Sequence, residues 1–400
     1  MADAYIIHMD DFDGIINVRE EIESCEERTL APFAALSKNS QGRKYPEEDH
    51  PFRTRFQRDR DRVVHSAAFR RLEYKTQVFV NHEGDHYRTR LTHTLEVAQI
   101  SRTIARGLKL NEDLAETIAL VHDLGHTPFG HAGEDVLDGL MQKHAGLRFN
   151  HNRQSLRVVE HIERRYPDFP GLNLTYETRE GIVKHETSYD LSEADDYNPD
   201  LNATLEAQIV NYADEIAYNC HDVDDGLFSN VLDLDEIMQI PLWGDLFHSS
   251  EKMHTELSRS RRQYHVIRML INREVTDLIT NTARNLQGHG VRSLDDVRKS
   301  KKPIMRFSDE LDAENRVLKH FLMDKMYRHW RLIRMTAKAK RILTSLFEAY
   351  IDDPKQLPPK YARMAEEESP ELVICDYVAG MTDRFALSEH QKLFDPLERV

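Results

Sequence analysis

The stretch Thr117-Ile-Ala-Leu-Val-His122-Asp123-Leu-Gly-His126-Thr-Pro-Phe-Gly-His131 leads an apolar helical run into a cluster of metal-binding residue types. The run predicts a helix that begins after Asn111, a suitable N-cap residue, and continues to about Leu124. Glycine and proline then interrupt the helix. Because the apolar run carries His122 and Asp123 toward the core, burying both without a metal or hydrogen-bond partners would be costly.

Two other segments place a metal-binding residue type on an apolar helix face. In residues 92–108, His93 shares a face with apolar residues at helical spacing, and in residues 203–225 Asp214 does the same. Any one of these residues, taken alone, is more often an ordinary hydrogen-bonded core residue. Together they predict a metal ion held between helices, with four ligands: His93, His122, Asp123 and Asp214.

Hydrophobic periodicity is helical along almost the whole chain, which predicts an all-α fold. We expect residues 1–45 to form an N-terminal arm and residues 46–400 a single large helical domain. Within that domain we expect a core at about 65–230 and a C-terminal helical part at about 231–400. The exception is a small β-hairpin near residues 75–90, where β-type residues flank a glycine-containing turn.

Breaks in the pattern set the expected element boundaries. Gly226 is expected to end the helix that begins near residue 203. The acidic segment 188–202 is expected to be a surface loop. Further helices are predicted at about 18–30, 133–143, 150–165, 177–186, 232–247, 251–285 and 317–351.

Composition excludes several classes of protein. The formal net charge of −15 argues against a protein coated by nucleic acid, but not against an anionic substrate in a locally positive pocket. No apolar run is long enough for a membrane helix, and the acidic start of the chain does not resemble a signal peptide. The 3 cysteines are far apart, so a reducing, cytoplasmic location is expected. The chain contains no P-loop, Cys-x-x-Cys or nucleophile-elbow motif.

The pattern His93, His122-Asp123, Asp214 resembles the signature of the HD-domain phosphohydrolases. More specific matches to one branch, the deoxynucleoside triphosphate triphosphohydrolases that include bacterial dGTPases, are Arg70-Arg-Leu-Glu-Tyr-Lys-Thr-Gln77, Tyr87-Arg-Thr-Arg-Leu-Thr-His93, His122-Asp-Leu-Gly-His-Thr-Pro-Phe-Gly-His131, Phe149-Asn-His-Asn-Arg-Gln-Ser155 and Ala213-Asp-Glu-Ile-Ala-Tyr218. The resemblance covers roughly residues 40–350. It implies an HD-type helical fold and a divalent metal, either Mg²⁺, Mn²⁺ or another transition metal.

The resemblance also implies a reaction, in which water attacks the α-phosphorus of a dNTP and releases deoxynucleoside and inorganic triphosphate. It points to His131 as the acid–base residue, with Glu134 one helical turn away to orient it. The competing interpretation of Glu134 is a surface carboxylate near a helix N-terminus. His151 matches a histidine near the phosphates, and either assists proton transfer or caps the helix that follows.

The resemblance assigns substrate contacts as well. Arg90 matches an arginine at the α-phosphate, and Gln77 a glutamine at the 3′-hydroxyl. Tyr218 and Asp222 match residues that close on the deoxyribose, where a tyrosine under C2′ would exclude ribonucleotides. His126 is either a phosphate donor or a loop histidine. The alternative for Tyr218 is an ordinary core aromatic residue, and the alternative for Asp222 is a carboxylate at a helix end. Lys184-His185 resembles a family motif more weakly, and a surface role is its alternative.

The resemblance implies a homo-oligomer, a hexamer or tetramer, with dNTP effectors or single-stranded nucleic acid as further partners and no membrane association. Two alternatives stay open: another HD-type phosphohydrolase of nucleoside monophosphates, cyclic or alarmone nucleotides, or a non-catalytic nucleotide- or ssDNA-binding protein. The intact set of ligands with His131 and Glu134 argues against the second. The preferred base, the metal and the role of the arm are not determined by these motifs.

Overall fold

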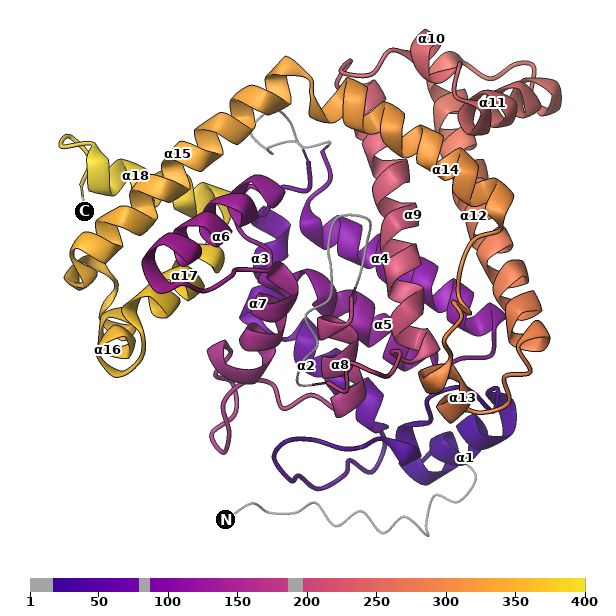
Figure 1. Ribbon diagram of the computed structural model, residues 1–400, viewed down its shortest axis with the longest axis horizontal. Coiled ribbons are helices and arrows are strands. Elements are labelled where there is room, and N and C mark those ends of the chain that lie inside the picture. The colour runs from indigo at the N-terminus through magenta and orange to yellow at the C-terminus, as the bar shows by residue number, and fades with distance from the viewer. Residues whose placement is uncertain (1–16, 79–86, 186–196, 400) are drawn as a thin grey trace.

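The computed structural model describes residues 17–78, 87–185 and 197–399 (Figure 1). Within these ranges the chain forms helices joined by short connections, and β-structure is limited to four isolated bridges. The predicted all-α fold is confirmed. No helix in these ranges combines the length and the apolar character that a membrane span requires.

The helices follow one another along the chain with few long connections. Their bounds are α1 Arg19–Thr29, α2 Arg55–Val64, α3 Ala67–Arg71, α4 Arg90–Gly107, α5 Glu112–Val121, α6 His131–Ala145, α7 His151–Arg157, α8 Tyr176–Val183, α9 Leu205–Phe228, α10 Leu234–Ile237, α11 Pro241–Met253, α12 Arg259–Gly288, α13 Leu294–Lys299, α14 Asp309–Leu322, α15 Trp330–Asp352, α16 Pro359–Glu367, α17 Pro370–Ala379 and α18 Asp383–Phe394.

The larger apolar core lies between α4, α5 and α9, which pack against one another (Figure 1). Helix α2 covers another side of α5, and α12 packs on α9 and α4. The apolar run of α5 explains its central position, because Leu114, Ile118 and Val121 have no exposed surface. Removing these side chains from water is the main force that places the end of α5 inside the molecule.

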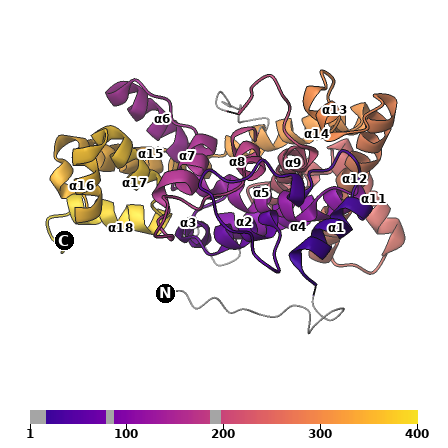
Figure 2. The ribbon, with the colours of Figure 1, turned by 90° about the horizontal axis from the view of Figure 1, so that it is seen from below.

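A second apolar core lies at one end of the molecule, where α6 and α15 to α18 gather (Figure 2). Leu137 of α6 packs there with Leu343 and Phe347 of α15 and with Val373 of α17, all of them fully buried. Helix α6 therefore joins this core to the segment that precedes it, residues 122–131.

The N-terminal helix and the predicted hairpin have different outcomes. The helix expected at 18–30 is present as α1, and residues 1–16 lie outside the described residues. Of the hairpin expected near 75–90, the described residues include one antiparallel bridge, between Thr76 and Thr89. Its expected turn, within residues 79–86, lies outside the described residues, as does most of the 188–202 loop.

The prediction that Gly226 ends a helix is wrong, because α9 continues through it to Phe228. A Cβ atom at this position would lie 2.6 Å from Leu232 Cδ1. The glycine therefore makes room for a neighbouring side chain and does not act as a helix stop. Its backbone stays helical because tertiary packing outweighs a weak local preference.

Other expected helices are shorter than predicted. Pro241 separates α10 from α11 inside the expected 232–247 helix, since proline is favoured at a first helical turn. A π-helical turn, Met323–Tyr327, ends the α14 segment before α15 begins. A similar π-helical turn, Val158–Ile162, follows α7 where one helix over 150–165 was expected.

Candidate active site

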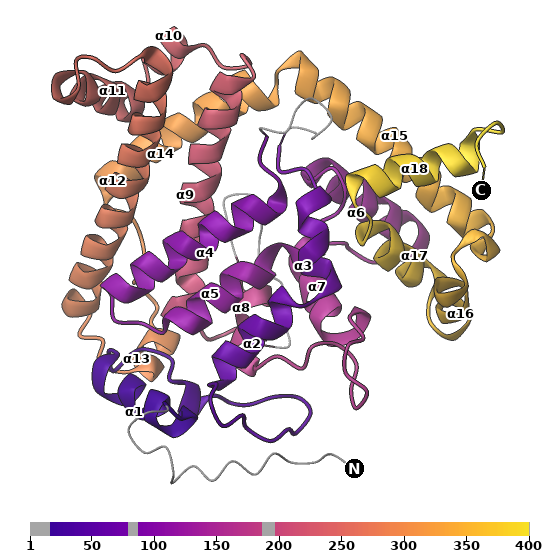
Figure 3. The same cartoon turned by 180° about the vertical axis from the view of Figure 1, so that it is seen from behind.

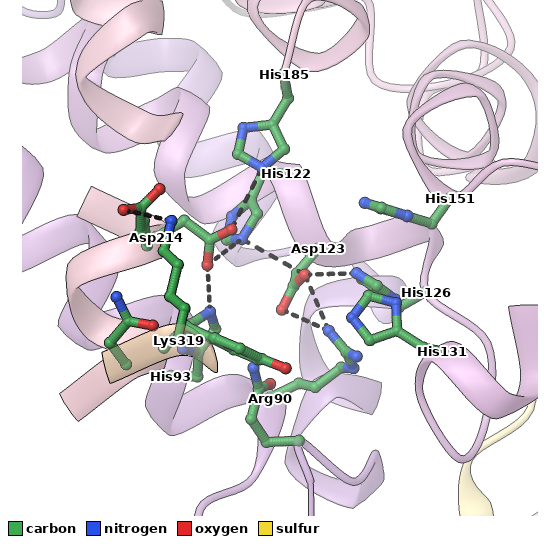
Figure 4. Close-up of a pocket in the computed structure, with 14 residues that line it drawn as sticks. Arg90, His93, His122, Asp123, His126, His131, His151, His185, Asp214 and Lys319 are labelled. Atoms are coloured by element: carbon green, nitrogen blue, oxygen red, sulfur yellow. Dashed lines mark hydrogen bonds and ion pairs between the residues drawn. The ribbon is translucent and has the colours of Figure 1, made fainter. Parts of the chain in front are cut away.

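A pocket with about 510 Å³ of empty space lies where α4, α9 and α14 meet the segment between α5 and α7 (Figure 4). The pocket is lined by Gln77, Arg90, His93, His122, Asp123, His126, His131, His151, His185, Asp214, Glu215, Tyr218, Asn219 and Lys319. Of the residues expected at the site, only Glu134 and Asp222 are absent from this lining.

His122 and Asp123 form the 3₁₀ turn His122–Gly125 directly after α5, and both are buried. The Nδ1–H of His122 donates to the carbonyl of Ala119, at 2.7 Å. Its Nε2 is buried without a hydrogen-bond partner, 3.4 Å from Asp123 Oδ1 and 3.9 Å from Asp214 Oδ1. Burial lowers the pKa of His122, so the ring is neutral and presents an Nε2 lone pair to the two carboxylates.

His93 of α4 is oriented by a chain of two further residues. Glu96 accepts a hydrogen bond from His221 Nε2, and His221 Nδ1 lies 3.2 Å from His93 Nδ1. Burial lowers the pKa of His221 to about 4, so this ring is neutral. If Glu96 holds the proton-bearing nitrogen of His221, the other nitrogen accepts from His93 Nδ1–H. The Nε2 of His93 is then left as a lone pair, 2.8 Å from Asp214 Oδ1.

Asp214 lies between three histidines. Besides His93 and His122, it faces His185, whose Nε2 is 3.4 Å from Asp214 Oδ2. Burial alone would raise the pKa of Asp214, but the neighbouring imidazoles of His185 and His93 hold it well below its ordinary value. Asp214 is therefore a carboxylate surrounded by imidazole nitrogens (Figure 4).

Asp123 is held by a cation on its other side. Both of its carboxylate oxygens lie 3.1 Å from Arg90 Nη1, and the two side chains are almost fully buried. Burial would raise the pKa of Asp123, but Arg90 and His122 keep it well below its ordinary value. Asp123 thus links the histidines around Asp214 to the arginine.

These residues fit a divalent metal. Two triads that share His122 bring their ligand atoms within 4.8 Å of one another: His93, His122 and Asp123, and His122, His185 and Asp214. Two acceptor atoms 2.8 Å apart, as in His93 and Asp214, repel unless a proton or a cation lies between them. The unpartnered Nε2 of His122 points to the same need. Neutral imidazoles and carboxylates suit several divalent metals, so the donors do not select one.

A second group of histidines lies beyond Asp123. His126 Nε2 is 3.1 Å from Asp123 Oδ1, and its ring stacks on His151 with centroids 3.9 Å apart. The His131 ring lies edge-on to His126 at 5.7 Å, and 46% of its side chain is exposed. Gly125 permits this arrangement, because a Cβ there would lie 2.2 Å from the His151 carbonyl.

Glu134 contacts two members of this group. It accepts from the backbone N–H of His151 at 2.8 Å and from His151 Nδ1 at 3.0 Å, whereas His131 Nδ1 is 3.6 Å away. Burial would raise the pKa of Glu134, but His151 and His131 lower it. The sequence expectation paired Glu134 with His131, and the geometry gives the shorter contacts to His151.

A third wall carries the residues expected at the sugar. Gln77 is buried, and its Oε1 atom has no hydrogen-bond partner among the described residues. Tyr218 stacks against Tyr327 with ring centroids 6.3 Å apart, and their hydroxyls are hydrogen-bonded. The Tyr327 hydroxyl also donates to Asp222, which is buried behind it. Burial raises the pKa of Asp222 well above its ordinary value.

The structure adds residues that the sequence did not assign to the site. Lys319 of α14 lines the pocket and pairs with Glu215 at 2.7 Å, and Tyr327 reaches the third wall from the end of the same segment. No spacing links these residues to α9, since they come from a distant part of the chain. His185 did carry a signal, its weak motif match, and its alternative as a surface residue is wrong because it is buried.

Comparisons with known proteins agree with this geometry. Residues 90–219 match the HD domain family, and residues 305–392 match the phosphohydrolase-associated domain. A protein of Geobacter sulfurreducens, named deoxyguanosinetriphosphate triphosphohydrolase-like, is 52% identical over 383 residues, which cover 95% of this chain and 99% of that protein. A protein of the same name from Ralstonia nicotianae is 50% identical and covers 91% of this chain and 94% of its own length.

Proposed function

Because the chain belongs to the family of HD-domain proteins named deoxyguanosinetriphosphate triphosphohydrolase-like, we propose that it hydrolyses deoxynucleoside triphosphates. The products would be a deoxynucleoside and inorganic triphosphate. The observation that carries this proposal is the pocket itself. It joins a set of metal donors, a buried arginine, a second histidine group and an unpartnered glutamine oxygen in one space.

The metal donors would hold a divalent ion, Mg²⁺, Mn²⁺ or another transition metal, through His93, His122, Asp123 and Asp214. When bound, such an ion polarises a phosphate oxygen and lowers the pKa of water. His185, which faces Asp214 from the other side, would keep that carboxylate oriented.

Arg90 would bind the α-phosphate. Its guanidinium is fixed by Asp123 at the junction between the two histidine groups, and its planar fork suits phosphate oxygens. His126, which also contacts Asp123, would donate to a neighbouring phosphate oxygen. Lys319 is a second cation on the pocket wall, and we assign it to the outer phosphates.

The proton steps would fall to the second histidine group. Water attacks the α-phosphorus, the bond from phosphorus to the 5′ oxygen breaks, and that oxygen needs a proton to leave as a hydroxyl. His131 lies at the exposed side of the pocket and would donate this proton. Glu134, through its contacts to His151 and His131, would hold both rings.

The third wall would bind the deoxyribose. The unpartnered Oε1 of Gln77 would accept from the 3′-hydroxyl. Tyr218 would pack under C2′ and leave no room for a 2′-hydroxyl. Its position is fixed by Tyr327, and Asp222 acts from behind that tyrosine, so we place Asp222 in support of the wall.

Other features implied by the resemblance stay predictions. They are a tetrameric or hexameric assembly and regulation by dNTPs or single-stranded nucleic acid. The cytoplasmic location expected from the cysteines stays a prediction as well. So does the division into an arm at 1–45 and a domain at 46–400 with a core at 65–230.

The proposal is tested by product analysis. The protein is incubated with each of the four dNTPs and Mg²⁺ or Mn²⁺ in ¹⁸O-labelled water. We expect deoxynucleoside and triphosphate, with the label in the triphosphate, because water attacks phosphorus. GTP is the control for sugar selection and should be turned over more slowly than dGTP.

Three outcomes would contradict the proposal. Release of pyrophosphate with a nucleoside monophosphate would mean that the bond between the α- and β-phosphates breaks, and not the bond from phosphorus to the 5′ oxygen. Turnover of nucleoside monophosphates, cyclic or alarmone nucleotides in place of dNTPs would favour another HD-type hydrolase. Binding of dNTPs or single-stranded DNA without any turnover, by protein loaded with either metal, would indicate a non-catalytic protein.

A further inference from the structure

Asp383, the first residue of α18, joins two chain segments that are far from it in sequence. Its Oδ2 accepts from the backbone N–H of Thr76 at 3.0 Å, and its Oδ1 accepts from the backbone N–H of Phe129 at 2.9 Å. The residue is 4% exposed. Both carboxylate oxygens are therefore used on backbone amides, inside the molecule.

The two segments that Asp383 joins carry pocket residues. Thr76 directly precedes Gln77, and Phe129 lies two positions before His131. The side chains of Gln77 and His131 come from different walls of the pocket. The distance between the third wall, which carries Gln77, and the second histidine group thus depends on a contact made by α18.

The turn that Asp383 holds is strained. Phe129 has a φ of 62° and Gly130 a φ of 61°, and a bulky side chain seldom adopts this conformation. Such a backbone persists only where its surroundings fix it. The bond from Phe129 N–H to Asp383 acts on the strained residue itself.

A second contact reinforces the same junction. Lys75 is fully buried, and its ammonium donates to the carbonyls of His126 and Ala379, the latter at 3.1 Å. Burial lowers the pKa of Lys75 to about 7, and Asp383 counteracts this shift. Burial likewise raises the pKa of Asp383, while Thr76, Phe129 and Lys75 favour its charged form.

The neighbouring helix α17 makes a similar contact with the third segment of the second histidine group. Asp376 accepts from Gln154 at 3.0 Å and from Arg157 at 2.9 Å, both on α7, which begins with His151. Figure 3 shows α17 and α18 at the end of the molecule that holds the second core, where α17 packs on α6. The C-terminal helices therefore reach the back of the pocket through polar as well as apolar contacts.

We propose that Asp383 is a positioning residue that sets the separation of Gln77 and His131 by bonding the backbones of Thr76 and Phe129. The inference rests on the proposed function for its effect on rate. The bonds themselves are independent of that function. A substrate held at Gln77 would reach His131 only while the two walls keep this separation.

The test compares Asp383→Ala and Asp383→Asn with Glu389→Gln. Glu389 lies on the same helix and accepts from Tyr350 at 2.9 Å and Tyr377 at 3.4 Å, so its loss weakens the C-terminal core without touching the pocket segments. Four quantities are measured well below each variant's Tm: kcat and KM for a dNTP, metal content, and hydrogen exchange of peptides covering 74–78 and 127–131.

For Asp383→Ala we expect kcat to fall by about 100-fold, the size of effect that a misplacement of about 1 Å can produce. Metal content should stay unchanged, and both peptides should exchange faster. Asp383→Asn keeps one acceptor oxygen and should protect one peptide and lose less rate. Glu389→Gln should keep kcat within about twofold even where its Tm is lower. If Asp383 had a purely structural role, its variants would behave in the same way: a lower Tm with a nearly unchanged kcat.

Two results would overturn the proposal: kcat of Asp383→Asn equal to that of Glu389→Gln, or unchanged exchange at both peptides in Asp383→Asn. That variant decides the matter if the alanine variant does not fold. If the unmodified protein turns over no dNTP, the proposed function fails, and the exchange and metal measurements alone decide whether Asp383 holds the two segments.

Discussion

Two groups of histidines meet at Asp123, and they differ in what surrounds them. In the first group, His93, His122 and His185 face the carboxylates of Asp123 and Asp214. In the second, His126 lies near Arg90, the rings of His131 and His151 pack against His126, and Glu134 contacts His131 and His151. The rings are chemically identical, so the difference between the groups comes from their partners.

The partner of the distal ring nitrogen decides what each histidine can do. In the first group a carbonyl holds His122 and a neutral histidine holds His93, which leaves Nε2 lone pairs aimed at one point. In the second group the carboxylate of Glu134 holds His151 Nδ1 at 3.0 Å. The first arrangement suits a metal and the second suits proton transfer.

The largest expected effect comes from breaking the first group. His122→Ala removes the ligand shared by two of the three candidate triads, the two that contain Asp123 or Asp214, so we expect metal and activity to be lost together. The loss of rate should exceed the roughly 100-fold that follows from losing an outer partner of a metal ligand. Metal content by elemental analysis and kcat/KM on the same sample check this. Full metal occupancy in the variant would contradict the assignment.

Breaking the second group should separate rate from metal. For His131→Ala we expect kcat to fall by about 10²–10⁴-fold, the range of general acid catalysis, while metal content is unchanged. His151→Ala is the comparison, because Glu134 lies closer to His151 than to His131. A near-normal kcat for His131→Ala together with a large loss for His151→Ala would transfer the acid role to His151.

The smallest expected effect tests the remote end of the first group. Glu96→Gln keeps an acceptor for His221 but removes the charge, so the orientation of His93 should weaken without being lost. We expect metal affinity to fall by about tenfold, at the low end for outer partners of metal ligands. Glu116→Gln is the control, since Glu116 pairs with Arg60 and Arg102 and, among the described residues, has no hydrogen bond or ion pair with a histidine. Equal metal affinity in both variants would show that Glu96 does not orient His93 through His221.

Much of the fold and of the site could be predicted from local pattern. The periodicity of α5 and the adjacent His122-Asp123 pair predict a buried ligand pair, and both residues are buried. Where prediction was wrong, side-chain packing decided the outcome. Gly226 looked like a helix stop, but Leu232 packs against it. Tyr327 and Lys319 could not be placed at the pocket, because nothing in their own segment indicates which helix they face.

The sequence by itself therefore determined the helical class, the family and the residue types that gather in the pocket. These follow from periodicity and from motifs whose members are close in the chain or share a helix face. Only the tertiary structure decided which ring nitrogens are left as lone pairs and which histidine Glu134 contacts most closely. It also decided that Asp383 bonds Thr76 and Phe129. A hydrogen bond depends on distance and direction between groups, and for residues far apart in the chain only the packing of the helices sets both.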